Sequence, residues 1–181
     1  MESRKKSIES IPFKSGDKVL IIGAGTGLDL TFLPDDCEII ATDITPSMIE
    51  RIKKRNAKLN KNVQATVMDG QKLEFDNNTF DVVILHLILA VIPNPIACIT
   101  ETERVLKLGG RVAVFDKFVP TNRKVTLLRK LLNVFANFFF TDITRDFESI
   151  ASKTKLTVIS DIGADFNGNF RIIQLTKNES K

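Results

Sequence analysis

Residues 18–27, with the sequence KVLIIGAGTG, decide the fold of this chain. Four consecutive aliphatic residues at 19–22 predict a short strand that is buried on both faces. The glycines that follow permit a sharp turn of the backbone, and we expect a helix to begin beyond them. A buried strand, a glycine turn and a helix together form the first unit of an α/β fold.

The same alternation of strand and helix continues along the chain. Apolar runs predict further strands at residues 38–42, 62–67, 80–85 and 111–115. A helix begins at Thr45-Pro46, with threonine as the N-cap and proline at the first helical position, and another spans residues 95–107. This alternation requires parallel strands, right-handed crossovers and helices on both faces, which is a doubly wound sheet.

The C-terminal part of the chain departs from this pattern. Residues 123–140 and 146–153 are predicted to be helices, and residues 156–162 and 170–176 are predicted to be strands. Because only a short, turn-rich segment separates these two strands, we expect an antiparallel hairpin at one edge of the sheet.

The composition excludes several classes of protein. The 181 residues suit one domain, and no run of eighteen uncharged apolar residues predicts a membrane-spanning helix. Two cysteines, Cys37 and Cys98, are too few for a disulfide framework or a structural zinc site, so we expect a cytoplasmic protein without a bound metal. A net charge of +4 is only mildly basic, and we expect no nucleic-acid partner.

Polar residues and glycines follow the ends of four predicted strands. The loop of Gly23, Gly25 and Gly27 follows the first strand, and Asp43, Asp69 and His86 follow the second, third and fourth. Ligands of doubly wound sheets bind beyond the carboxyl ends of the strands. These positions therefore predict one cofactor pocket, although a tight strand–helix turn without a ligand remains the alternative.

The details of the loop narrow the kind of ligand. Leu28 stands where a dinucleotide-binding fingerprint has its third glycine. A phosphate-binding loop has Lys followed by Ser or Thr, whereas this chain has Leu28-Asp29, and a carboxylate beside a pyrophosphate would be repulsive. The loop therefore favours a cationic or zwitterionic ligand.

The two carboxylates suit particular parts of a nucleoside. A carboxylate at Asp43 can accept hydrogen bonds from both hydroxyls of a ribose, or Asp43 can simply precede the helix that begins at Thr45. Asp69 can accept a hydrogen bond from an adenine amino group, or it can cap the turn at Gly70.

Four stretches together resemble a known family. They are VLIIGAGTG at 19–27, ATDITPSMI at 41–49, VMDGQKLEFDNNTFDVVILHLILAVIPNP at 67–95 and ETERVLKLGGRVAVFDKF at 101–118. In this order and spacing they resemble the class I S-adenosylmethionine-dependent methyltransferases. Within that superfamily the chain looks most like the small-molecule group that includes ubiquinone/menaquinone C-methyltransferases and bacterial phosphatidylethanolamine N-methyltransferases. The stretch AVIPNP at 90–95 is most similar to the phospholipid enzymes.

The resemblance implies a fold and a set of contacts with S-adenosyl-L-methionine. The expected fold is a seven-stranded, mostly parallel Rossmann-like sheet with a reversed last strand, in a single domain over residues 1–181. Residues 17–118 would bind the cofactor, and residues 119–177 would lie on the substrate side. The residues expected at the cofactor are Gly23, Ala24, Gly25, Thr26 and Gly27 at the methionine part, Asp43 at the ribose, Ile44 and Met48 beside the adenine, Asp69 and Gly70 at its amino edge, and the backbone of Leu85 and His86 near the methionine.

Two departures from the family pattern concern the cofactor. Ile21 stands where the family commonly has an acidic residue that helps to anchor the ammonium group, and Asp29 is a candidate to replace it. The family usually has an N-terminal segment that covers the cofactor. Here residues 4–10 would have to supply this lid, or the pocket is open.

His86 is the candidate catalytic residue. An amine acceptor must lose a proton before it can attack the methyl group, and His86, expected to face the pocket, could act as the base. The alternative is a residue of the pocket wall with a ring nitrogen that is already hydrogen bonded.

Residues 123–140 suggest a lipid acceptor. Basic side chains there alternate with leucine and phenylalanine, as in helices that lie at anionic membrane surfaces. The alternative is a helix that packs on the sheet with a solvated basic side. Our leading interpretation is methyl transfer from S-adenosylmethionine to a small-molecule or lipid acceptor, such as the amine of phosphatidylethanolamine. The alternatives are a catalytically weak cofactor-binding or membrane-associating module, and an O- or C-methyltransferase.

Overall fold

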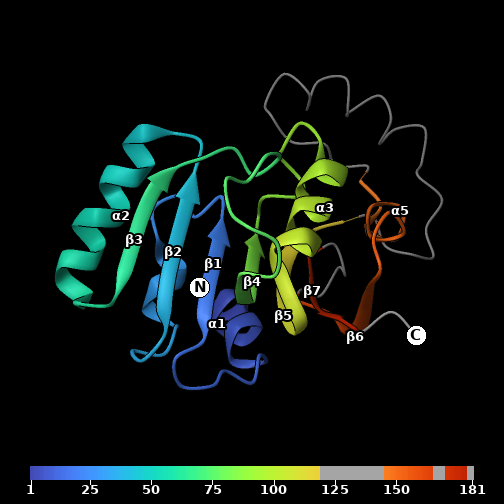
Figure 1. Cartoon of the computed structure of the whole chain (residues 1–181), viewed down its shortest axis with the longest axis horizontal. Helices are drawn as coiled ribbons and strands as arrows, with labels where there is room; N and C mark the ends of the chain where they lie inside the picture. Colours follow the sequence, from blue (N-terminus) through green and yellow to red (C-terminus); the bar gives the residue numbers. More distant parts are fainter. Residues whose placement is uncertain (119–144, 165–169, 179–181) are drawn as a thin grey trace.

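A seven-stranded sheet forms the centre of the computed structural model, which describes residues 1–118, 145–164 and 170–178 (Figure 1). Its strands are β1 (Lys18–Ile22), β2 (Glu38–Asp43), β3 (Val63–Val67), β4 (Phe80–His86), β5 (Leu106–Lys117), β6 (Leu156–Gly163) and β7 (Phe170–Lys177). The helical elements are α1 (Glu2–Glu9), the 3₁₀ turn η1 (Leu28–Thr31), α2 (Pro46–Leu59), α3 (Pro95–Val105) and α5 (Phe147–Ala151).

The strand order is β3-β2-β1-β4-β5-β7-β6. The first five strands in this order pair in parallel, and β7 pairs antiparallel with both β5 and β6. The predicted doubly wound sheet with an antiparallel C-terminal edge is therefore confirmed. The order reverses between β1 and β4, and a ligand of such a sheet binds at this switch point.

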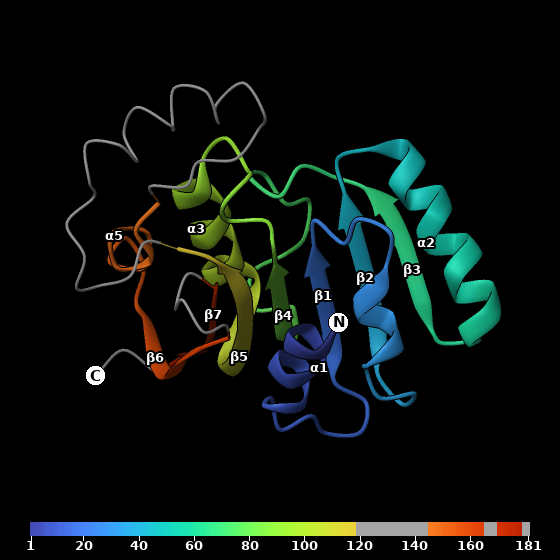
Figure 2. The same ribbon diagram turned by 180° about the vertical axis from the view of Figure 1, so that it is seen from behind.

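Helices cover both faces of the sheet. The elements α1, η1 and α2 lie on one face, and α3 and α5 lie on the other (Figures 1 and 2). Alternate residues of β4 enter the two separate cores: Val82 and Ile84 pack toward the α1 side, and Val83 and Leu85 pack toward the α3 side. His86 continues the alternation, so its side chain lies on the α1 side.

The segment after the glycine loop is shorter than the sequence suggests. We expected a helix beyond Gly27, but only the four-residue turn η1 forms. Pro34 explains the difference, because proline disfavours helical geometry in the residue before it and lacks an N–H to donate. The helix α1 was not predicted at all.

The start of β5 also differs from the prediction. The helix was expected to continue to Lys107, but α3 ends at Val105, and Leu106 already pairs with Phe80 of β4. Leu106 is fully buried, so burial in the sheet outweighs its helical preference. The predicted helix at 123–140 lies outside the described residues. Across the described ranges, no helix has the length and apolar character needed to cross a bilayer.

Candidate functional site

A cavity of about 180 Å³ opens at the carboxyl ends of β1, β2, β3 and β4. It brings together five residues that the sequence analysis assigned to the cofactor, namely Gly23, Asp43, Ile44, Asp69 and Gly70. The remaining lining residues, which the sequence analysis did not assign, are Ile22, Met68, Gln71, Ile88, Val91, Ile92 and Pro93. The wall of the cavity therefore comes from four segments that are distant in sequence.

The carboxylate of Asp43 is held by two backbone groups. The N–H of Gly25 donates to Oδ2 at 2.8 Å, and the N–H of Thr45 donates to Oδ1 at 2.9 Å. Each oxygen of an ionised carboxylate can accept more than one hydrogen bond. Asp43 thus fixes the glycine loop against the entry to α2, and both oxygens can still accept a hydrogen bond from a ligand.

Gly23 allows the segment after β4 to approach the glycine loop. Its φ is +67°, and a Cβ atom built there would lie 2.6 Å from Cδ1 of Ile88. A larger residue would therefore be strained in its backbone and would push Ile88 away. Since both residues line the cavity, the width of the cavity depends on this glycine.

Asp69 both lines the cavity and caps a turn. Its carboxylate accepts hydrogen bonds from the backbone N–H of Gln71 at 2.9 Å and from the side-chain amide of Gln71. The other end of that amide accepts a hydrogen bond from the N–H of Asn94 at 2.9 Å. Gln71 therefore joins the segment after β3 to the start of α3, and the adenine contact of Asp69 stays a prediction.

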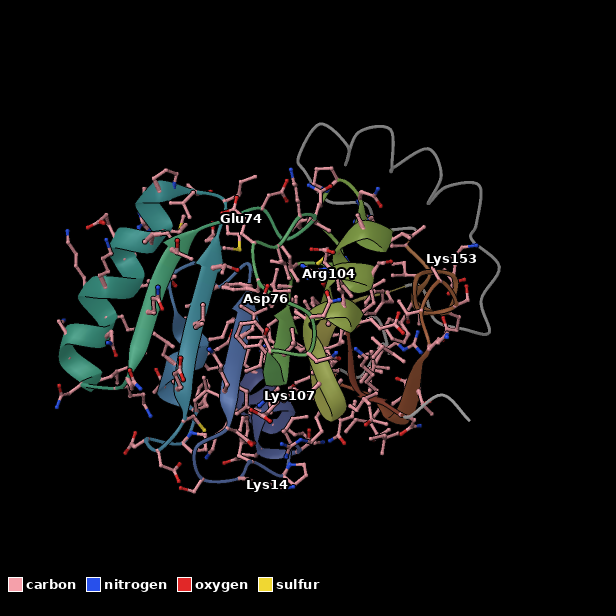
Figure 3. The ribbon with its side chains drawn as sticks, viewed as in Figure 1. Lys14, Glu74, Asp76, Arg104, Lys107 and Lys153 are labelled. Atoms are coloured by element: carbon pink, nitrogen blue, oxygen red, sulfur yellow. The ribbon has the colours of Figure 1, made fainter. Side chains whose placement is uncertain are left out.

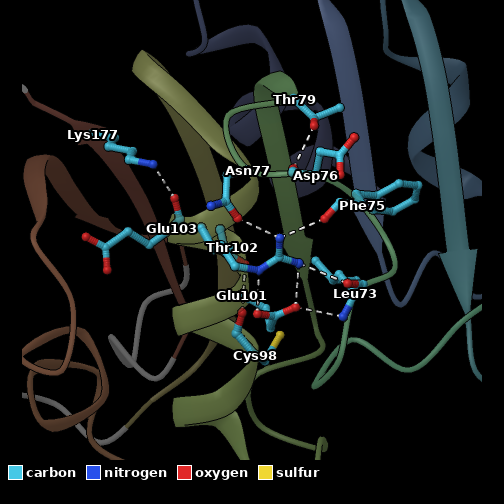
Figure 4. A network of polar contacts seen from close by, with 11 residues as sticks. Leu73, Phe75, Asp76, Asn77, Thr79, Cys98, Glu101, Thr102, Glu103 and Lys177 are labelled. Carbon is cyan, nitrogen blue, oxygen red and sulfur yellow. Dashed lines mark hydrogen bonds and ion pairs between the residues drawn. The ribbon is translucent and has the colours of Figure 1, made fainter.

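Arg104 of α3 holds the rest of the segment between β3 and β4 (Figures 3 and 4). Its guanidinium donates to the carbonyls of Leu73 and Phe75 at 2.9 and 2.7 Å, and to the side chain of Asn77 at 2.9 Å. Glu101 binds the same guanidinium through both carboxylate oxygens at 2.8 Å. The segment has no helix or strand of its own, and these contacts join it to α3 together with the hydrogen bond from the N–H of Leu73 to Glu101 at 2.8 Å.

Several residues assigned to the cofactor do not line the cavity. They are Ala24, Gly25, Thr26, Gly27, Met48 and Leu85. Gly25 acts instead through its hydrogen bond to Asp43, and the carbonyl of Thr26 accepts a hydrogen bond from Arg55. Leu85 is fully buried in the core on the α3 side. Their predicted contacts with the cofactor remain predictions.

His86 lies away from the cavity, so the expectation that it faces the pocket is wrong. Its side chain is fully buried. Its Nε2 lies 3.0 Å from Oγ of Ser7, and its Nδ1 lies 2.9 Å from Oδ1 of Asp29. The ring is hydrogen bonded, as in the alternative, but it does not belong to the wall of the cavity.

Asp29 is the centre of this buried network. Arg4 of α1 donates to both of its carboxylate oxygens, at 2.8 and 2.7 Å. Burial alone would raise the pKa of Asp29, but the hydrogen bond from His86 and the positive charge of Arg4 outweigh this effect and hold the pKa below its ordinary value. The carboxylate is therefore committed to α1 and β4 and does not face the cavity.

The position of Asp29 corrects one expectation and bears on another. Asp29 cannot replace an acidic residue at Ile21, because its carboxylate binds Arg4 and His86 on the α1 side of the sheet. Residues 4–10 were the candidate lid, and they mostly form α1. No residue of α1 is among the residues that line the cavity.

Asp116 is a buried carboxylate near the end of β5. It is 1% exposed, and it accepts hydrogen bonds from the N–H groups of Ala90 at 3.0 Å and Lys117 at 2.7 Å. Burial raises its pKa despite these backbone hydrogen bonds. Asp116 thus ties the loop after β4, which carries Ile88, Val91 and Ile92, to the end of β5.

The lining residues missed by the sequence analysis are mainly apolar. Ile88, Val91 and Ile92 belong to the stretch LILAVIPNP, whose aliphatic residues resemble core residues in sequence. The signal that could have identified them is their position directly after a buried strand, where a doubly wound sheet binds its ligand.

Comparison with known proteins identifies a family. The methyltransferase domain family matches residues 20–114. The phosphatidylethanolamine N-methyltransferase of Cereibacter sphaeroides is 24% identical over 164 residues, which cover 90% of this chain and 81% of that protein. A ubiquinone/menaquinone biosynthesis C-methyltransferase of Teredinibacter turnerae is 33% identical over 140 residues, which cover 74% of this chain and 55% of that protein. The chain thus spans about half the length of this quinone-methylating relative.

Solved structures share the fold. The YcgJ protein of Bacillus subtilis superposes with a TM-score of 0.81 at 17% identity, covering 99% of both chains. A methyltransferase-like protein of Bacillus halodurans superposes with a TM-score of 0.79 at 15% identity, covering 99% of this chain and all of that one.

The buried network around Asp29 predicts a specific loss of stability in acid. Asp29→Asn should reduce the free energy of unfolding by about 3 kcal/mol at pH 7, because it leaves the buried Arg4 and His86 contacts without a charged acceptor. The folded-state pKa of Asp29 lies below the unfolded value near 3.8, so this stabilisation is complete above that value and is lost as the pH falls through the folded pKa.

Denaturant unfolding between pH 3 and 7 tests this prediction. The difference between the parent and Asp29→Asn should shrink below about pH 4. Asp36→Asn is the control, because Asp36 is exposed and its side chain forms no ion pair with any residue that the structure describes, so it should contribute little at any pH. A difference of constant size down to pH 3 would contradict the lowered pKa.

The Arg104 network predicts how the segment between β3 and β4 is held. Arg104→Met should lower the free energy of unfolding by about 2 kcal/mol, because the carbonyls of Leu73 and Phe75 lose their Arg104 donor and Glu101 keeps only the N–H of Leu73. Amide hydrogen exchange should become faster in residues 71–79 than in β1. Lys72→Met removes a cation from the same segment without touching this network and is the control; equal exchange in both variants would count against the assignment.

Proposed function

The chain belongs to the methyltransferase domain family, whose members use S-adenosylmethionine, and we propose that the cavity at the strand ends binds this cofactor. We further propose that the chain methylates a lipid amine, with phosphatidylethanolamine as the candidate acceptor. The charge of the cavity supports the cofactor most strongly. Its lining contains two carboxylates, Asp43 and Asp69, and no lysine or arginine. A cavity of this charge attracts a cationic ligand and repels phosphates.

The residues present also fit the nucleoside part of the cofactor. Asp43 offers two fixed carboxylate oxygens, which suit the adjacent hydroxyls of a ribose. Ile44 is 64% exposed beside it, and Met68 and Ile92 line the same cavity. Apolar side chains on both sides of a slot suit a flat purine ring.

Position 21 offers no acidic side chain to the ammonium group of the cofactor, because it is an isoleucine. Ile21 is 1% exposed and packs in the core on the α1 side. In this proposal the ammonium group is held by backbone carbonyls of the glycine loop.

An apolar rim supports a lipid acceptor. Leu87, Val91 and Ile96 are 38%, 43% and 40% exposed. Val91 lines the cavity, Leu87 directly follows β4, and Ile96 lies in the first turn of α3. Leu87 also has a φ of +58°, which is uncommon for a residue with a branched side chain and marks a constrained backbone at the strand end. Exposed aliphatic side chains suit the acyl chains of a lipid. The similarity to a phosphatidylethanolamine N-methyltransferase over 81% of that protein supports the same acceptor.

The chemistry asks the chain mainly for alignment, because the amine of the acceptor gives its proton to water before it attacks the methyl group with its free lone pair. When bound, S-adenosylmethionine supplies a methyl group on a sulfonium that is already a good leaving group. The chain's own contribution is to hold the cofactor through Asp43, to shield the reacting atoms with Ile88 and Val91, and to orient the acceptor at the rim. His86 acts in this proposal as a positioning residue, because its bond to Asp29 fixes the segment that follows the glycine loop.

Methylation at carbon is the second candidate. The 33% identity to a quinone C-methyltransferase favours it, and an apolar rim also suits a prenylated ring. A module that binds the cofactor but turns over slowly is the third candidate, and the isoleucine at position 21 supports it.

The cofactor site is tested by Asp43→Asn. The variant keeps the shape of the side chain but replaces one acceptor oxygen by a donor, so affinity for S-adenosylhomocysteine should fall by about 30-fold. Calorimetry measures this change, and a thermal melt confirms that the variant is folded. Asp76→Asn, at an exposed position outside the cavity, is the control; unchanged affinity in Asp43→Asn would exclude the ribose role.

The acceptor is tested with a radiolabelled methyl group. We expect transfer to phosphatidylethanolamine in mixed micelles and little transfer to demethylmenaquinone. If only the quinone became labelled, methylation at carbon would be favoured over methylation of a lipid amine. Cofactor binding without transfer to any acceptor would favour the slow module, whereas failure to bind the cofactor would reject the whole proposal.

A further inference from the structure

A row of four cations lies along one side of helix α2. Arg51, Lys54, Arg55 and Lys58 follow the spacing i, i+3, i+4 and i+7, which places them on one face of a helix. Arg51, Lys54 and Lys58 are exposed, and Arg55 is half-buried. With a rise of about 1.5 Å per residue, the row is about 10 Å long.

The row lines a groove of about 360 Å³. Its fifth lining residue is Thr26, whose carbonyl accepts a hydrogen bond from Nε of Arg55 at 2.8 Å. Among the described residues, the two terminal nitrogens of this guanidinium make no hydrogen bond. Arg55 is therefore held within the groove with two donors still available.

The groove contains no carboxylate. Elsewhere on and beside the same helix, Lys53 pairs with Glu50 at 2.9 Å, and Lys61 pairs with Asp35. Arg51, Lys54 and Lys58 form no ion pair with any residue that the structure describes. Like charges three and four residues apart on a helix repel one another, so a bound anion would relieve an unfavourable interaction.

The short turn η1 leaves this side of α2 uncovered. A full helix after the glycine loop does not form, because Pro34 follows so soon. Gly27 lets the loop pack closely against α2, since its φ is +73° and a Cβ at this position would lie 3.2 Å from Cδ1 of Leu30 and 3.3 Å from Cγ1 of Ile52. The groove thus results from the shortness of η1 and not from a gap in the sheet.

We propose that this groove binds an anion with two or more phosphate groups. The length of the row exceeds what one phosphate can contact, and two arginines offer forked donors that match phosphate oxygens. The short row, with Arg55 fixed by the carbonyl of Thr26, suits a discrete anion better than an extended membrane surface. It also contains no aromatic side chain on which a nucleic-acid base could stack. The groove is separate from the Asp43 cavity, whose carboxylates would repel the same anion.

Titration calorimetry of the full chain with sodium pyrophosphate tests the proposal. We expect one site per chain, with an affinity that falls as sodium chloride is added. Lys54→Gln and Lys58→Gln should each weaken binding by about tenfold. Lys53→Gln is the matched control, because it removes the same charge from another side of the same helix and should leave the affinity nearly unchanged.

Four outcomes would overturn the proposal. The first is the absence of binding heat at low salt, and the second is an equal loss of affinity in Lys53→Gln. The third is equal affinity for orthophosphate and pyrophosphate. The fourth is that Lys54 and Lys58 matter for binding to phosphatidylglycerol vesicles or single-stranded RNA but not for binding to pyrophosphate. Equal affinity would show that one phosphate suffices, and the last outcome would assign the row to a membrane or a nucleic acid. Circular dichroism of each variant confirms that α2 is intact, and none of these measurements requires methyl transfer.

Discussion

The hydrogen bond from the N–H of Gly25 to the carboxylate of Asp43 joins the two loops on which the site depends. One loop follows β1 and the other follows β2, and parallel pairing of these strands brings their carboxyl ends together. The second oxygen of Asp43 holds Thr45, where α2 begins. One carboxylate therefore sets the shape of the glycine loop, the start of a helix and the acidic wall of the cavity.

The glycine loop separates two regions of opposite charge. Asp43 and Asp69 line the cavity on one side, and the basic row of α2 lines the groove that includes Thr26. This separation of charge favours different ligands at the two sites, because the acidic cavity repels anions and the basic groove repels cations. Because Arg55 binds the carbonyl of Thr26, a ligand in the groove would contact a residue that also supports the loop.

Ser7, His86 and Asp29 show that the right residue types at hydrogen-bond distance do not by themselves make a catalytic site. The distances of 3.0 and 2.9 Å match a nucleophile, base and acid arrangement. However, Ser7 is fully buried, so no substrate can reach its hydroxyl. The three side chains instead attach α1 to the end of β4 and to η1. Their role is structural and not catalytic, because a substrate cannot reach them.

The sequence by itself determined the sheet and its crossovers, because strand-length apolar runs and glycine turns are local patterns. Together with the family resemblance, it also indicated five of the residues that line the cavity. It could not determine the direction of the His86 side chain, which follows from the alternation of side chains along β4 and from the unpredicted α1. Nor could it show that Asp29 is bound by Arg4, or that Pro34 leaves the basic side of α2 uncovered. These features depend on contacts between residues distant in sequence, and only the tertiary structure brings such residues together.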